Sequence, residues 1–285
     1  MINAIKLYRR IPWAAKIGFT IIFLNIFCAV FAPILAPYNE TEIAGDVWES
    51  PIWSKNAKPH NIPVIFGTDH IGRDLFSRLM FGARNTISLA FVTTALAFFV
   101  GSISGFMAAT LKGWVDQTLS RMVDILMAFP TLILALGILS VMGTSIPVLV
   151  FVIALIDSTR VFRISRAVAM DIEVMEYVEA GRLRGENLWW IMKEEILPNA
   201  LSPLVAEFGL RFCFVFLFIS SLSFLGLGLQ PPLADWGSMV RENSSAISFG
   251  ILTPLIPAAA IALLTVGVNL VVDWFLHKAS GIKDV

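Results

Sequence analysis

The sequence has few charged residues for its length. Only 15% of its 285 residues are charged, against about 25% in an average soluble domain. Lys and Arg together number 21, as do Asp and Glu, so the formal net charge is zero. A nucleic-acid-binding protein would carry a basic excess instead. The composition therefore excludes an ordinary cytosolic enzyme and predicts no nucleic acid partner.

Residues that perform hydrolysis or bind metals are also scarce. The three histidines, His60, His70 and His277, lie at or beyond the ends of the apolar segments, and the first two are interpreted as solvated loop residues. Cys28 and Cys213 lie within apolar segments and are interpreted as buried hydrophobic side chains. Zinc-hydrolase, nucleophile-elbow and phosphate-loop motifs are absent. We therefore predict no catalytic residue, metal site or bound cofactor, so the energy source must be a gradient or a partner.

Long apolar segments, by contrast, are abundant. Hydrophobic residues make up 57% of the chain, and the charges are bunched between apolar runs. A helix needs about 20 apolar residues to cross a bilayer core of about 30 Å. The runs of this size without a charge are Ile17–Asn39, Asn85–Leu111, Ile125–Ile156, Phe212–Ala234 and Asn243–Val272.

The third run is too long for one crossing, since it would extend roughly 48 Å as a helix. Gly143 and Pro147 lie near its middle. We therefore predict two helices joined by a tight turn, the second running from about Ile146 toward Arg163. The expected fold class is an all-α integral membrane protein with six transmembrane helices.

Lys and Arg residues near short loops predict the orientation, because they favour the cytoplasmic side. Six spans place four basic segments on that side, namely the N-terminus (Lys6, Arg9, Arg10, Lys16), the segment with Lys112 and Arg121, the stretch 163–198 and the C-terminus (Lys278, Lys283). Five spans would move 163–198 outside, so six are favoured, with both termini cytoplasmic. A cleaved signal peptide is disfavoured for the first run, since Phe31-Ala32-Pro33 offers no cleavage site.

The longest predicted cytoplasmic loop, residues 171–199, combines two helical patterns. Apolar residues recur every three to four positions up to Leu183, which predicts a short amphipathic helix from about Asp171 to Leu183. Gly185 ends that helix, and a second helix begins at Leu188 and ends at Pro198. Taken alone, the first helix would be an interfacial anchor.

The same loop contains Glu179-Ala180-Gly181, then Gly185, and later Ile196-Leu197-Pro198. This spacing resembles the EAA loop of binding-protein-dependent ABC importer permeases, which forms a coupling helix that docks into a cleft of the ATPase subunit. The resemblance implies that these residues couple the chain to an ATPase. Gly181 departs from the usual second alanine and lowers the helix propensity by about 1 kcal/mol.

Two further segments, Phe66–Arg84 and Leu222–Gly237, are similar to the signature of dipeptide, oligopeptide and nickel permeases. This resemblance implies a type I importer permease in a bacterial inner membrane. It implies as partners a second homologous permease, two ATP-binding subunits that hold ATP and Mg, a periplasmic binding protein and membrane lipid. Peptides are the first expected substrate, with nickel chelates, opines and modified sugars left open.

The resemblance also suggests a division of the chain. Residues 1–84 are expected to form the cytoplasmic N-terminus, the first transmembrane helix and a periplasmic loop with an interfacial helix. Residues 85–285 are expected to form a five-helix core that contains the loop 171–199.

The stretch before the second span has charges at helical spacing, Asp69, Arg73, Asp74 and Arg78. Asp74 and Arg78 are four residues apart and can pair on a helix surface. Two interpretations stay open. The segment either anchors the second span and pairs its own charges, or it contacts the binding protein or the other permease.

Proline and glycine predict local backbone features. Gln230-Pro231-Pro232 cannot continue a helix, so we expect irregular backbone near the outer mouth, with Gln230 and Trp236 against the binding protein. Gly101 and Gly105 have the spacing of small residues that allow close helix packing.

Charged residues within spans are candidates for function. Asp157 and Arg160 are three residues apart, and Glu207 and Arg211 are four apart, so each pair can neutralise itself on one helix face. Structural pairing is favoured, and a role in the gate or path is the alternative.

The leading function hypothesis is a translocation subunit that alternates between inward-open and outward-open states as partner subunits bind ATP. A gradient-driven secondary transporter is the alternative, although it would need coupling-ion residues near the membrane centre. An intramembrane enzyme is disfavoured because nucleophile and base pairs are absent.

Overall fold

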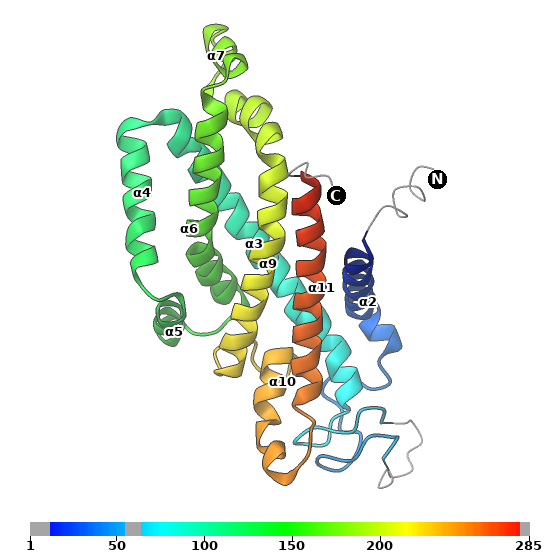
Figure 1. The fold of residues 1–285 in the computed structure, drawn as a ribbon. Helices are drawn as coiled ribbons and strands as arrows, with labels where there is room; N and C mark the ends of the chain where they lie inside the picture. Colours follow the sequence, from blue (N-terminus) through cyan, green and yellow to red (C-terminus); the bar gives the residue numbers. More distant parts are fainter. Residues whose placement is uncertain (1–11, 55–63, 280–285) are drawn as a thin grey trace. The chain divides into compact units, whose positions relative to one another are not determined.

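The computed structural model describes residues 12–54 and 64–279. Within these ranges the regular structure is helical, with only two isolated bridges, Ile43 to Arg73 and Thr68 to Asp74. The all-α class is therefore confirmed (Figure 1). The elements are α2 (Trp13–Leu35), α3 (Leu75–Leu111), α4 (Gly113–Ala128), α5 (Thr131–Met142), α6 (Ile146–Glu173), α7 (Glu176–Leu183), α8 (Leu188–Trp190), the π-helix η1 (Ile191–Ile196), α9 (Leu197–Phe224), α10 (Trp236–Glu242), the 3₁₀-helix η2 (Ser244–Phe249) and α11 (Leu255–Ala279). Lys6, Arg9, Arg10, His60 and Lys283 lie outside the described residues.

Four helical segments of the described chain are long and apolar enough to cross a membrane. They are Trp13–Leu35, Leu75–Leu111, the continuous segment Leu188–Phe224 and Leu255–Lys278. A fifth is obtained if α4 and α5, which meet at 89°, form one broken span. Length and composition thus support four or five spans, and α6 does not qualify by these criteria.

Several predicted span boundaries are wrong because capping groups, and not hydropathy alone, determine where a helix begins. The charge-free run from Asn85 continues a helix that begins ten residues earlier, where the Asp74 carboxylate accepts hydrogen bonds from the backbone N–H and hydroxyl of Ser77. The span predicted as Asn243–Val272 begins only at α11. The 3₁₀-helix and Gly250, with a φ of 73°, separate α11 from the residues before it.

The predicted turn near Gly143 is confirmed between α5 and α6. A second break, between α4 and α5, was not predicted. Phe129 has extended backbone, with φ −89° and ψ 139°, directly before Pro130. Proline disfavours helical backbone in the residue that precedes it, which explains why the helix ends at this dipeptide.

The predicted boundaries in loop 171–199 also need correction. The single helix expected over Asp171–Leu183 is divided between the end of α6 and α7. Pro198 does not end the second helix, which continues into α9, so the span predicted as Phe212–Ala234 lies too far along the chain. The backbone N–H of Leu197 donates to the carbonyl of Met192, five residues back. This wider π-helical turn accommodates the proline that follows.

The helices gather into two compact units. Unit 1 contains Met1–Ala90, Thr144–Ile146 and Phe216–Trp274, and unit 2 contains Phe91–Gly143, Pro147–Val215 and Phe275–Val285. The expected division into 1–84 and 85–285 stays a prediction. Cys213 is buried and Cys28 is half-buried, and neither forms a disulfide bond in the described part of the chain.

Close glycine packing occurs in both units. In unit 2, a Cβ at Gly101 would lie 2.6 Å from the Cβ of Val161, and one at Gly105 would lie 2.8 Å from the carbonyl oxygen of Phe162. This confirms the packing role predicted for these two glycines, with α6 as their neighbour. In unit 1, a Cβ at Gly18 of α2 would lie 2.6 Å from the carbonyl oxygen of Gly267 in α11.

Candidate functional site

Loop 171–199 lies in unit 2 and has at its tip the eight-residue helix α7, which follows α6 (Figure 1). Acidic Glu176 and Glu179 occupy the first turn of α7 and Arg182 the last, an arrangement that matches the helix dipole. Gly185, with a φ of 82°, ends the helix, and its N–H donates to the carbonyl of Arg182 at 2.9 Å. No heavy atom lies within 4 Å of a Cβ built at Gly185, so the backbone conformation is what requires glycine there.

The inner face of α7 is apolar. Val178 is fully buried in a cluster formed with residues of α3, α6, η1 and α9, namely Phe106, Ala109, Ala169, Ile172, Ile191, Met192, Ile196, Ala200 and Leu204. Gly181 also faces inward, and a Cβ there would lie 3.4 Å from the Trp190 ring, an ordinary contact distance. An alanine would therefore fit, and the glycine is not a steric requirement.

The predicted coupling residues divide between the surface and the interior. Glu179, Ala180 and Gly185 are exposed, as are Leu197 and Pro198. Ile196 is fully buried and packs in the apolar cluster. An apolar side chain that the prediction did not include, Leu183, is 83% exposed at the end of α7.

Arg184 joins the two arms of the loop, which the sequence did not reveal. Its guanidinium lies 5.3 Å from the centre of the Trp190 ring and 3.7 Å from a carboxylate oxygen of Glu195.

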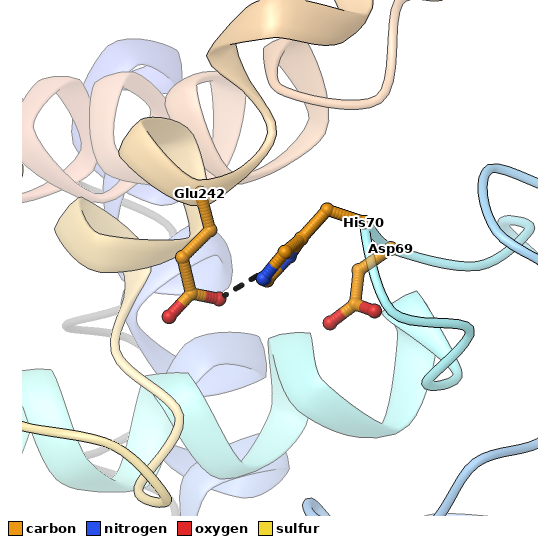
Figure 2. Close-up of side chains that lie close together, drawn as sticks. All are labelled: Asp69, His70 and Glu242. Carbon is orange, nitrogen blue, oxygen red and sulfur yellow. Dashed lines mark ion pairs between the residues drawn. The ribbon is translucent and has the colours of Figure 1, made fainter.

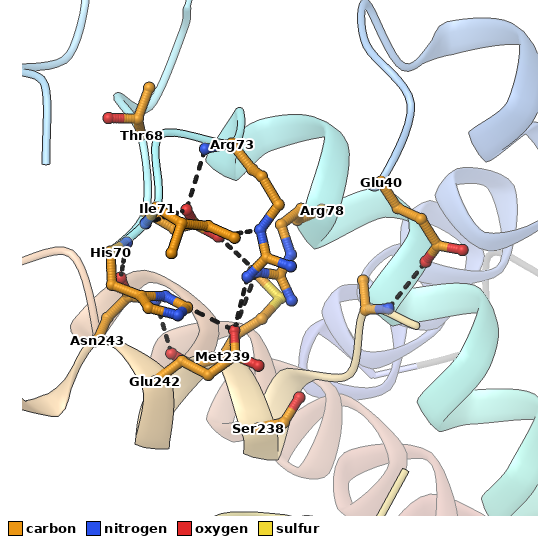
Figure 3. Close-up of polar contacts among 12 residues, drawn as sticks. Glu40, Thr68, His70, Ile71, Arg73, Arg78, Ser238, Met239, Glu242 and Asn243 are labelled. Carbon is orange, nitrogen blue, oxygen red and sulfur yellow. Dashed lines mark hydrogen bonds and ion pairs between the residues drawn. The ribbon is translucent and has the colours of Figure 1, made fainter. Parts of the chain in front are cut away.

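A cluster of buried charges lies in unit 1, and we name it the Asp69 cluster; its members are Asp69, Arg73, Arg78 and Glu242. Figure 3 labels Arg73, Arg78 and Glu242. Asp69 Oδ2 accepts from Arg73 Nε at 2.7 Å and also from Arg78 Nη1. Glu242 Oε2 lies 3.0 Å from Arg73 Nη2 and 2.9 Å from Arg78 Nη1. Asp69 is 0% exposed and Arg78 is 1% exposed, so two carboxylates and two guanidinium groups neutralise each other inside the protein.

The predicted Asp74–Arg78 pair is wrong. Asp74 caps α3 through Ser77, and the Arg78 side chain is directed toward Asp69 and Glu242 instead. Burial raises the pKa of the Asp74 carboxyl, and the hydrogen bonds from Ser77 oppose this increase. This geometry favours the interpretation that the segment pairs its own charges.

His70 lies beside this cluster, partly buried and not solvated as expected. Its Nδ1 is 3.9 Å from Glu242 Oε2, and its backbone N–H donates to Asn243 Oδ1 at 3.0 Å. Ligand atoms of Asp69, His70 and Glu242 lie within 4.8 Å of one another (Figure 2). Because two guanidinium groups already bind both carboxylates, this arrangement fits an ion-pair cluster better than a cation site. Burial raises the pKa of Glu242, and Arg73 opposes the increase.

The segment between α9 and α10 is irregular, as predicted from Gln230-Pro231-Pro232. Gln230 is exposed, and its side-chain amide donates to the carbonyl of Gly228 at 2.9 Å. The expected contact of Trp236 with a binding protein does not hold, since this side chain is 1% exposed. Its indole N–H donates to the Leu79 carbonyl at 2.9 Å, and its ring lies against Gly82 of α3.

The charges within α6 and α9 are arranged differently from the prediction. The Glu207–Arg211 pair is confirmed at 2.7 Å. The Asp157–Arg160 pair is wrong, because Asp157 faces Arg211 of α9 at 3.7 Å while the Arg160 guanidinium lies 4.3 Å from the centre of the Phe214 ring. Asp157 therefore links two helices and does not neutralise its own helix face.

Ion pairs between α4 and α6 were also missed. Arg166 binds both carboxylate oxygens of Asp116, at 2.5 and 2.7 Å, and Arg163 lies 2.7 Å from Asp124. Each partner is 39 or 50 residues away along the chain. No local spacing rule could have identified pairs with such separations.

Comparisons with known proteins agree on one family. The family model described as "Binding-protein-dependent transport system inner membrane component" matches residues 100–278. A di/tripeptide transport system permease protein of Pseudomonas aeruginosa is 32% identical over 90% of this chain and 84% of its own. A probable D,D-dipeptide transport system permease protein of Escherichia coli is 31% identical over 93% of this chain and 84% of its own.

A third relative is a glutathione transport system permease protein of Pectobacterium atrosepticum, which is 32% identical over 73% of this chain and 69% of its own. Among solved structures, one titled "Crystal structure of an amino acid ABC transporter with histidines" has a TM-score of 0.54 and 19% identity. It covers 71% of this chain and 94% of its own, and the likeness concerns the fold alone.

Proposed function

Because the chain belongs to the family of binding-protein-dependent transport system inner membrane components, we propose that it is the permease of an ATP-driven importer of peptides. The family is one of transport components and not of enzymes. The observation that carries the proposal is identity of 31 to 32% over about nine tenths of the chain to permeases named for dipeptides and tripeptides. Membership of this family removes the support for a gradient-driven secondary transporter.

We propose six spans with both termini in the cytoplasm, α6 being the crossing that composition alone does not identify. Its 28 residues extend about 42 Å at 1.5 Å per residue, which is enough to cross a bilayer core. Its charges are what lower its hydropathy, and three of them have partners on neighbouring helices. Asp157 faces Arg211, Arg163 faces Asp124, and Arg166 faces Asp116. Paired charges of this kind are compatible with a span inside a helix bundle.

The family description supports the partners that we propose. The chain would assemble with a second homologous permease, two ATP-binding subunits that hold ATP and Mg, and a periplasmic binding protein. Movement between inward-open and outward-open states would be driven by ATP binding in the partner subunits.

The contact with the ATPase would be made by α7. One face of this helix is held by Val178 in the apolar cluster, while Ala180 and Leu183 remain exposed on its other surface. A short helix that is anchored on one side and presents small and apolar residues on the other fits a groove in a partner protein.

The test is to widen the exposed surface of α7. Ala180→Trp should still insert and fold, because the side chain is exposed, but it should lose co-purification of the ATPase and peptide uptake, since overpacking disrupts a fitted interface. Ala14→Trp, at an exposed alanine near the start of α2, is the matched control and should retain both. Parental ATPase binding and uptake in Ala180→Trp would contradict the docking role, because a merely interfacial helix tolerates tryptophan well.

A further inference from the structure

Glu173, the last residue of α6, binds two cations at once. Its Oε2 lies 2.7 Å from Lys112 Nζ, and its Oε1 lies 2.5 Å from Arg182 Nη2. The Glu173 side chain is only 4% exposed, whereas the side chains of Lys112 and Arg182 are 61% and 42% exposed. One buried carboxylate in unit 2 therefore joins three elements, namely the α3–α4 junction, the end of α6 and α7.

The α3–α4 junction is a sharp reversal of the chain. Lys112 has a φ of 52° and Gly113 a φ of 57°, so two successive residues have a positive φ. Such a conformation is unfavourable for a residue with a side chain and persists only where its surroundings hold it. Lys112 is held by Glu173, and Arg182 also donates to the Thr110 carbonyl, in the last turn of α3, at 3.4 Å.

The other attachments of α7 lead to different elements. Val178 packs into the apolar cluster, and Arg184 contacts Trp190 and Glu195 in the second arm of the loop. The described polar contacts from α7 to α6 and the α3–α4 junction pass through Arg182, and Glu173 is the carboxylate that binds it. Without this carboxylate, Lys112 and Arg182 would be like charges near each other. The polar link from α7 to α3 would be reduced to the 3.4 Å hydrogen bond from Arg182 to the Thr110 carbonyl.

We propose that Glu173 is a positioning residue that makes α7, the end of α6 and the α3–α4 junction move as one body. The inference rests on the proposed docking of α7 to an ATPase, and it adds the route by which displacement of α7 reaches the spans. A rigid contact of this kind transmits a movement, whereas a loosened one lets α7 turn alone. Loss of the Glu173 contacts would therefore separate ATP hydrolysis from transport without removing the ATPase.

The test measures peptide uptake and ATP hydrolysis in the same proteoliposomes, which contain the complete transporter and its binding protein. Glu173→Gln keeps the shape of the side chain but removes its charge. We expect it to retain the ATPase subunits and hydrolysis, while uptake per ATP falls about tenfold. Glu194→Gln removes an exposed carboxylate of η1 whose ion-pair partner is its neighbour Lys193, and it should behave like the parent.

A double-mutant cycle distinguishes this role from general destabilisation. Arg182→Gln should reduce uptake per ATP as Glu173→Gln does, and the double variant should be no worse than either, because both changes remove the same contact. The proposal would be overturned if the loss of uptake per ATP in the double variant were the product of the two single losses. It would also be overturned if Glu173→Gln had the parental uptake per ATP. If Glu173→Gln does not assemble, the test rests on Arg182→Gln. Reduced uptake per ATP in Arg182→Gln then supports the proposal, and parental uptake per ATP overturns it.

The outcome is separate from that of the proposed function. Normal coupling in Glu173→Gln together with ATPase loss in Ala180→Trp would remove only the role of Glu173. Normal ATPase binding in Ala180→Trp would remove the docking of α7 itself.

Discussion

The loop 171–199 of unit 2 and the Asp69 cluster of unit 1 both contain motif residues recognisable in the sequence. These residues differ in burial, since several in the loop are exposed and those in the cluster are buried. In the loop, Glu179 and Ala180 are exposed, and a partner could reach them directly. In the Asp69 cluster, Asp69 and Arg78 are almost fully buried and bind each other. A motif can therefore mark either a surface for another protein or an internal framework, and only burial distinguishes the two.

The energetic consequences differ accordingly. Removing one partner from a buried ion pair leaves an uncompensated charge in a medium of low polarity, which is strongly unfavourable. Changing an exposed side chain normally costs less than about 0.5 kcal/mol of stability. Variants of the Asp69 cluster should thus fail by unfolding, whereas variants of α7 should fail in function while remaining folded.

The largest expected effect is that of Arg78→Ala. This change leaves Asp69 and Glu242 with one guanidinium fewer, and we expect it to lower the free energy of unfolding by about 3–5 kcal/mol. Thermal unfolding of the purified chain in detergent measures the loss. Arg84→Ala, at an exposed arginine of the same helix, is the control and should change stability by less than about 0.5 kcal/mol. Equal stability of the two variants would contradict the view that the Asp69 cluster is a framework.

A smaller effect is expected from Gly82→Ala. A Cβ at Gly82 would lie 2.7 Å from the Trp236 ring, which is fully buried and hydrogen-bonded through its indole N–H. The ring cannot move freely, so the overpacking should lower the free energy of unfolding by about 1–3 kcal/mol. Unfolding in detergent combined with Trp fluorescence would detect both the loss and any displacement of the ring. An unchanged or higher stability would show that the α3–α10 contact is looser than its geometry indicates.

The third prediction concerns pH and Asp235, the residue that caps α10. Its carboxylate accepts from the Ser238 N–H and from the Thr86 hydroxyl, both at 2.9 Å, and burial raises its pKa above the ordinary 3.8. The folded state therefore holds this proton to a higher pH than the unfolded state does. The stabilisation by the protonated group is complete below the unfolded pKa and is lost as the pH rises through the folded pKa.

Asp235→Asn imitates the protonated carboxyl and should remove this contribution. Comparing the unfolding midpoints of the parent and the variant between about pH 4 and about pH 7 isolates Asp235 from the other titrating groups. The parent should lose stability relative to the variant as the pH rises. The opposite slope would mean that hydrogen bonding to the carboxylate outweighs its burial.

The sequence predicted those features that depend on neighbouring residues. Glu207 and Arg211, four apart, pair as expected, Gly185 ends α7, and Gly101 and Gly105 pack closely against α6. The membrane class and the family also followed, because apolar length and motif spacing are local properties. The break before Pro130 could have been predicted too, since the residue before a proline avoids helical backbone, but the length of the apolar run concealed it.

The remaining features depend on contacts between distant parts of the chain. Arg78 finds Glu242 at a separation of 164 residues, and this long-range contact displaces the local Asp74 pair that the spacing suggested. Asp157 likewise prefers Arg211 on another helix to Arg160 on its own. Charge spacing along one helix therefore predicts a possible pair, while the packing of helices decides which pair forms.

The smallest effect, and the one that sharpens the comparison most, is expected from Gly181→Ala. A Cβ at Gly181 would lie 3.4 Å from the Trp190 ring and 3.8 Å from an Arg184 nitrogen, so it fits without displacement. Alanine favours a helix by about 1 kcal/mol over glycine, which corresponds to about fivefold lower population of the locally opened form of α7. Hydrogen exchange over residues 176–185 measures this change, and uptake should stay at the parental level.

Gly82→Ala and Gly181→Ala thus make the same chemical change with opposite expected effects on stability. If both variants lose stability, the inner face of α7 is as tightly packed as the α3–α10 contact, and the two regions differ only in the exposure of their outer residues.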